Sequence, residues 1–87
     1  MKVTWKKVPE NQVIARLRRA VEPRGYVVYA NESARPGELR WRWAGPGDKA
    51  YIDPAGMLAS LELLTVNEQI MYDKSTRRMA VFRAVRK

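Results

Sequence analysis

The sequence of 87 residues contains no cysteine and no histidine. Without cysteine, neither a disulfide framework nor a thiolate metal site can form. Without histidine, the commonest metal ligand and the usual general base at neutral pH are both missing. We therefore expect a protein that is not an enzyme and that uses no cofactor and no metal ion.

Long apolar runs are also missing. No run approaches the ~18 apolar residues that a membrane-spanning helix requires, and the first residues show no signal-peptide pattern. We therefore expect a cytoplasmic protein with no membrane partner. Two domains in so short a chain would each be marginal, so residues 1–87 are predicted to form a single domain.

The charged residues that are present are distributed unevenly, within a formal net charge of +8. Residues 1–30 hold seven Lys and Arg against two Glu, and residues 69–87 hold six against Asp73 alone. Residues 31–68 hold four against six acids. Concentrated positive charge repels itself within a small domain and attracts polyanions at long range. The pattern therefore indicates a polyanionic class of partner.

Apolar spacing predicts the first elements of the fold. A helix over roughly 9–22 follows from one apolar stripe at three- and four-residue steps, and Pro23 and Gly25 end it. Strands are expected at 2–5, at 26–30 and at 39–43, with residues 50–52 as a hairpin partner of the last. The stripe comprises Val13, Ile14, Leu17, Ala20 and Val21.

The second half of the chain begins with a strong helix start, with Asp53 as the N-cap and Pro54 at the first helical position. Farther on, Thr65 and Glu68 match a capping box, which would start another helix at Val66. The competing prediction is a hairpin of residues 69–72 and 79–84, closed by 73–76. The hairpin is favoured because residues 73–78 contain no apolar side chain to sustain a helical stripe.

This order of elements predicts an α+β fold. We expect a two-layer sandwich, in which a mainly antiparallel sheet of four to five strands carries two helices packed on one face.

The alternating strand at 39–43 carries the first candidate site. Trp41 and Trp43 lie on one face and Arg40 and Arg42 on the other. The tryptophans are expected in the core, since a small domain needs its large side chains inside. The two arginines would then lie on an open sheet face and either contact phosphates or remain solvated.

The remaining candidate cations lie in the C-terminal run and on the first helix, where solvation is again the alternative to phosphate binding. The helix arginines spread over a wide arc and no second helix follows closely, so base readout is not expected. The complete set of predicted nucleic-acid-binding residues is Arg16, Arg19, Arg40, Arg42, Lys74, Arg77, Arg78 and Arg83.

Catalytic and metal sites find no support. Residues 45–49 lack the spacing and the GK[ST] ending of a phosphate-binding loop. Asp48, Asp53 and Glu62 are the only acids close enough in sequence to suggest a carboxylate metal site, and Asp53 is already explained as a helix cap.

Two functions remain. The first is a non-catalytic protein that binds DNA or RNA through the phosphate backbone with little sequence preference. The second is a small protein-binding module or inhibitor that docks on an acidic surface of a host enzyme or complex. In size and charge, the chain is similar in general character to inhibitors deployed by phages and mobile elements.

Overall fold

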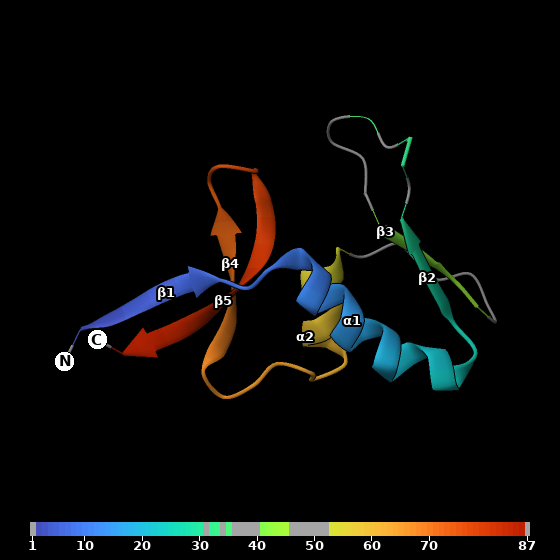
Figure 1. The fold of residues 1–87 in the computed structure, drawn as a ribbon, viewed down its shortest axis with the longest axis horizontal. Helices are drawn as coiled ribbons and strands as arrows, with labels where there is room; N and C mark the ends of the chain where they lie inside the picture. Colours follow the sequence, from blue (N-terminus) through green and yellow to red (C-terminus); the bar gives the residue numbers. More distant parts are fainter. Residues whose placement is uncertain (1, 31, 34, 36–40, 46–52, 87) are drawn as a thin grey trace.

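The computed structural model describes residues 2–30, 32, 33, 35, 41–45 and 53–86 (Figure 1). Two helices and antiparallel strands make up these residues, which agrees with an α+β fold. The elements in chain order are β1 (Val3–Lys7), α1 (Glu10–Val21), the 3-10 turn η1 (Glu22–Arg24), β2 (Val27–Ala30), β3 (Trp41–Ala44), α2 (Pro54–Ser60), β4 (Glu68–Asp73) and β5 (Arg78–Arg86).

The described strands form two separate sheets, so the expected single sheet of four to five strands is not confirmed. One sheet has three strands in the order β1-β5-β4, and the other pairs β2 with β3. Figure 1 shows the helices between these two sheets. The predicted partner strand at 50–52 lies outside the described residues, as do Leu39 and Arg40.

Helix α1 confirms the predicted apolar stripe. Val13, Ile14, Leu17 and Val21 are buried, and Leu17 is only 1% exposed. The chain leaves η1 through Gly25, whose φ of 90° lies in the left-handed region that favours glycine. The stripe packs against α2 and β2, so α1 is the element around which the core is built.

Helix α2 begins as predicted. An oxygen of the Asp53 side chain accepts a hydrogen bond of 3.3 Å from the Ala55 backbone N–H, and Pro54 occupies the first turn. Leu58 on this helix has no exposed surface. The buried core consists of Val8, Val13, Ile14, Leu17, Val21, Val28, Ala55, Leu58 and Val81.

The predicted hairpin is confirmed, with a turn at 74–77 between β4 and β5. Asp73 fixes the turn by accepting hydrogen bonds from the backbone N–H and the hydroxyl of Ser75, at 3.0 and 2.7 Å. The capping-box residues start no helix. The Glu68 N–H donates to the Thr65 carbonyl at 3.1 Å, which forms a turn leading into β4.

Candidate nucleic-acid interface

The two basic ends of the chain lie side by side in the structure. Strand β1 pairs antiparallel with the second half of β5, from Lys7 opposite Phe82 to Val3 opposite Arg86. We call these paired residues, 3–7 and 82–86, the terminal ribbon. It contains no Asp or Glu and carries four cations, which are Lys6, Lys7, Arg83 and Arg86.

A row of charged residues crosses the three-stranded sheet where the terminal ribbon meets β4. Lys6 lies opposite Arg83, and Arg83 lies opposite Glu68. Arg16 of α1 reaches the same carboxylate, with nitrogen–oxygen distances of 2.7 and 3.2 Å. We call these four residues the cation row. Three cations and one carboxylate leave two positive charges in excess.

Glu68 is the centre of the cation row, and its side chain has no exposed surface. Besides the two bonds from Arg16, it accepts one from Arg83 at 2.9 Å and one from the Thr65 N–H at 3.0 Å. The bonds from Arg16 are the main reason that the pKa of Glu68 lies well below its usual range. The same contact raises the pKa of Arg16. Arg16 therefore joins α1 to the three-stranded sheet.

A second group of cations lies at the opposite end of the β4–β5 hairpin. Lys74 and Arg77 are exposed in the turn, and Arg78 lies 4.0 Å from an oxygen of Asp53. Lys7 reaches Asp73 at 2.6 Å, and this pair together with Ser75 lowers the pKa of that carboxyl group. Strand β4, about 17 Å long, separates this group from the cation row.

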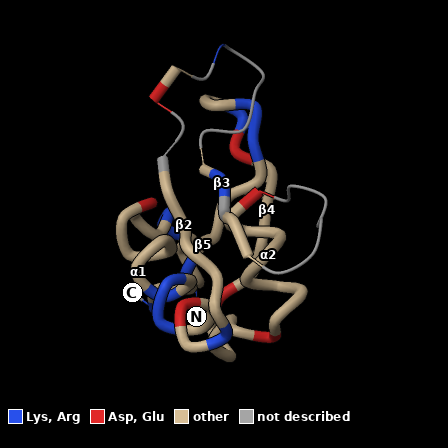
Figure 2. The backbone as a smooth tube through the Cα atoms, turned by 90° about the vertical axis from the view of Figure 1, so that its right-hand side faces the viewer, with Lys and Arg blue, Asp and Glu red and all other residues tan. Residues whose placement is uncertain are grey.

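Among the described residues, the positive charge is thus spread over separate parts of the molecule rather than gathered into one continuous patch. Figure 2 shows Lys and Arg at the β4–β5 turn at the top and, separately, in the lower part around α1 and the chain ends. Arg19 is exposed on α1, one turn after Arg16. Arg42 is half-buried on β3 opposite Tyr29, while Arg40 lies outside the described residues.

Sequence reasoning did not single out Lys6 or Lys7, and it considered Glu68 only as a residue of a capping box. The signal available was the alternation of residues 3–7 and 82–86, together with their lack of acids. Nothing local indicated that these two segments pair. The expected core position of Trp41 is met in part, because it is half-buried, packs against the core from outside and donates through its indole N–H to Glu10. The Trp43 side chain lies outside the described part of the structure.

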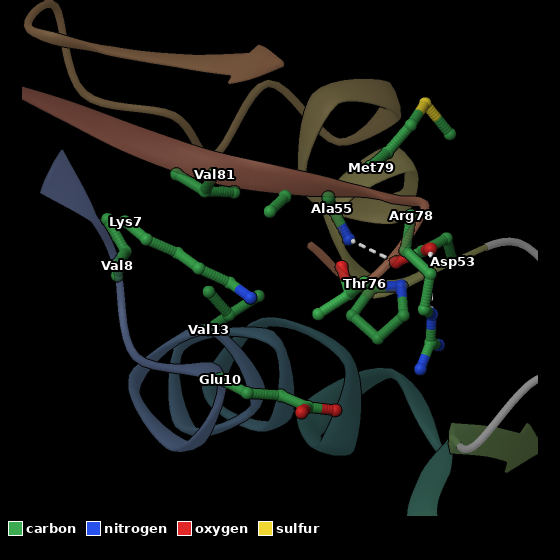
Figure 3. A pocket seen from close by; sticks show the side chains of 12 residues that line it. Lys7, Val8, Glu10, Val13, Asp53, Ala55, Thr76, Arg78, Met79 and Val81 are labelled. Atoms are coloured by element: carbon green, nitrogen blue, oxygen red, sulfur yellow. Dashed lines mark hydrogen bonds and ion pairs between the residues drawn. The ribbon is translucent and has the colours of Figure 1, made fainter. Parts of the chain in front are cut away.

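A pocket of about 150 Å³ lies between the end of β1 and the starts of α1, α2 and β5 (Figure 3). Its rim carries Lys7 and Arg78 but also Glu10 and Asp53, so the charges balance. Its volume is below the ~300–1,000 Å³ of typical small-molecule sites. The pocket therefore offers no cationic site for a polyanion.

Among the described residues, no three acids stand close enough together to hold a metal ion. No helix in that part of the chain is both long and apolar enough to cross a membrane. No protein-family model matches the sequence, and no curated protein or solved structure matches it at a significant level.

Proposed function

We propose that this protein binds nucleic acid without catalysis, through phosphate contacts made by the terminal ribbon and the cation row. The observation that carries the proposal is the pairing of Lys6 with Arg83 inside an acid-free ribbon. Like charges directly opposite each other across two strands destabilise a sheet. A phosphate bound between them would relieve that repulsion.

A purely structural explanation covers only part of this arrangement. Strand β1 is an edge strand of its sheet, and lysines on edge strands prevent unwanted pairing with other chains. That explains Lys6 and Lys7. Arg83 on the central strand β5 is explained in part by its bond to Glu68 on one side, but it faces a lysine on the other.

The cations divide into different roles under this proposal. Arg16 is occupied by Glu68 and holds the fold together. One guanidinium nitrogen of Arg83 bonds to Glu68, and 42% of the Arg83 side-chain surface is exposed. Its other N–H donors can therefore reach a phosphate. Lys6 and Arg19 are exposed and add phosphate contacts, and Arg86 is exposed on the other face of the sheet, which also carries Lys7. Contacts to phosphates fix position without reading sequence, so little sequence preference is expected.

The test is a titration of labelled single- and double-stranded DNA and RNA at several salt concentrations, followed by fluorescence anisotropy. The double variant Lys6→Gln/Arg86→Gln should bind more weakly and depend less on salt. Each lost phosphate contact lowers the slope of log affinity against log salt by about 0.9 on duplex and about 0.7 on a single strand.

The matched control is Arg24→Gln/Arg35→Gln, which removes the same charge from exposed positions outside the ribbon. Arg24 lies in η1, at the opposite end of the molecule from the ribbon in Figure 1. Equal losses in the two double variants would show that only total charge matters. No binding of any nucleic acid at low salt would overturn the proposal.

A second candidate function is docking on an acidic protein surface, and one observation favours it. Tyr72 and Met79 face each other on the β4–β5 hairpin and are 61% and 48% exposed. Exposed cations in the adjacent turn would attract an acidic partner, and strand β4 could extend the partner's sheet. A stoichiometric complex that is lost in Tyr72→Ser, together with absent nucleic-acid binding, would favour this function.

A further inference from the structure

The strand register places an apolar stripe across the three-stranded sheet. Side chains that pair across antiparallel strands point to the same face, and alternate residues share a face. Phe82 lies opposite Lys7, Trp5 opposite Ala84, and Met71 opposite Ala80. Trp5, Phe82 and Met71 therefore follow one diagonal over β1, β5 and β4, on the face that does not carry Val81. We call these three residues the outer stripe.

The helices do not cover the outer stripe. Val81, on the other face of β5, is 1% exposed and belongs to the core, and Ile70 packs against that core. Among the described residues, neither the core nor the side chains packed on it include any member of the stripe. Trp5 is 38% exposed, and Phe82 and Met71 are half-buried. Trp5 and Phe82 thus lie on the sheet face outside the helix-packed core, and this face becomes buried only toward Ala80, which is 9% exposed.

The neighbours of the stripe leave its rings accessible and add positive charge. Ala80 and Ala84 flank Phe82 along β5, and neither can cover its ring. Lys7 and Arg86 lie on the same face, and the Lys7 ammonium forms an ion pair with Asp73. Aromatic rings bordered by cations suit a ligand with flat, unpaired rings and a negatively charged backbone.

We propose that the outer stripe binds single-stranded nucleic acid, with bases stacked on Trp5 and Phe82 and phosphates near Lys7 and Arg86. The inference rests on the proposed function and makes it more specific, since bases in a duplex are already paired and stacked. Diagonal neighbours on a sheet are about 7–8 Å apart, so two rings can receive two separate bases. Base stacking tolerates any base, which agrees with little sequence preference.

The test compares three labelled ligands of equal length: an oligothymidylate of about 12 nucleotides, the same strand with most bases removed, and a duplex. The wild type should bind the oligothymidylate about 100-fold more tightly than the abasic strand, since two stacked bases, each contributing about tenfold, add to the phosphate contacts. Trp5→Leu should lose about tenfold on the oligothymidylate and nothing on the abasic strand. Trp5→Phe retains a ring and should recover most of the affinity.

Tyr72→Leu is the matched control, because Tyr72 is an exposed aromatic on the other face of the same sheet, and it should bind like the wild type. Circular dichroism and thermal melting show whether each variant folds. Phe82→Leu in the central strand is interpreted only if it melts like the wild type.

The outcomes separate the two proposals. Equal wild-type affinity for the normal and the abasic strand overturns stacking and leaves phosphate binding intact. No binding to any of the three ligands overturns both. Self-association in sedimentation that Trp5→Leu abolishes, with no preference for bases, would assign the stripe to contacts between copies and would also overturn stacking.

Discussion

Glu68 is fully buried and charged at the same time, because four N–H donors surround its two oxygens. A buried carboxylate without such partners would be protonated or would destabilise the fold. Two of the donors come from Arg16, which is 52 positions away in the sequence. One side chain thus joins α1 to the start of β4.

This contact predicts how stability changes with pH. Because the pKa of Glu68 is lower in the folded protein than the ~4.3 of an unfolded glutamate, its contribution is present above about pH 4 and is lost as the pH falls. At pH 7, Glu68→Gln should lower the unfolding free energy by about 1–3 kcal/mol, since an arginine loses its charged partner.

Thermal melts from pH 7 to pH 2 measure the effect. The wild type should lose stability below pH 4 more steeply than Glu68→Gln, whose remaining acid sensitivity comes partly from Asp73 and its bond from Lys7. Glu22→Gln on the exposed turn η1 is the control and should keep the wild-type slope. Identical slopes in the wild type and Glu68→Gln would contradict this role of the carboxylate.

The bonds of Glu68 to Arg16 and Arg83 could not be predicted from the sequence. Only its local interaction with Thr65 gave a recognisable pattern. The spacing of Thr65 and Glu68 suggested a helix start, and the structure retains half of that interaction, with the Thr65 N–H bonded to the carboxylate. Pairing with Arg83 across β4 and β5 prevents the helix. Arg16 was expected at a phosphate and instead bonds to a residue that only the tertiary fold brings near.

Opposed like charges distinguish the terminal ribbon from an ordinary pair of strands. Lys6 is exposed and lies opposite Arg83, whose only described carboxylate partner also bonds to Arg16. Removing the lysine charge should therefore stabilise the unbound protein. The proposed function requires the opposite effect on binding.

We predict that Lys6→Gln raises the unfolding free energy by about 0.2–1 kcal/mol at low salt. The same variant should weaken nucleic-acid binding. Urea unfolding and anisotropy on the same samples measure the two effects, and Lys2→Gln, just outside the ribbon, serves as control. A variant that is less stable than the wild type would contradict the repulsion argument.

In the two-stranded sheet, the residue before β2 packs closely against the residue after β3. A Cβ atom on Gly45, directly after β3, would lie 2.2 Å from a ring carbon of the partly buried Tyr26. Gly45→Ala should therefore displace the ring and destabilise the protein by about 1–3 kcal/mol. Thermal melting measures this, with Ala44→Gly as a comparison that removes volume instead. An unchanged melting temperature in Gly45→Ala would contradict the contact.

Local sequence patterns predicted the helices and strands better than they predicted which strands pair with each other. The stripe of α1, the cap of α2 and the polar turn of the hairpin are local signals, and each element formed where expected. Strand pairing depends on residues far apart. The pairing of β1 with β5 and the separate β2–β3 sheet had no local signal, so the single larger sheet was the simplest expectation.

At the scale of the whole molecule, the net charge of +8 acts against the compact state. Screening by salt should therefore raise stability. Raising the salt concentration from about 0.01 to 0.2 M shortens the Debye length from ~30 Å to under ~10 Å, within the 46 Å length of the molecule. We expect the melting temperature to rise by a few degrees over that range. A fall would show that ion pairs such as Lys7–Asp73 outweigh the repulsion.

The pairing of β1 with β5 also determines when β1 can join its sheet during synthesis. Residues 3–7 are synthesised before residues 82–86 and have no strand partner until those residues follow. Throughout that interval Val3 and Trp5 are exposed on an unpaired strand that could attach to other nascent chains. Lys2, Lys6 and Lys7 oppose such attachment by mutual repulsion. The lysines of this segment would thus oppose aggregation of the nascent chain.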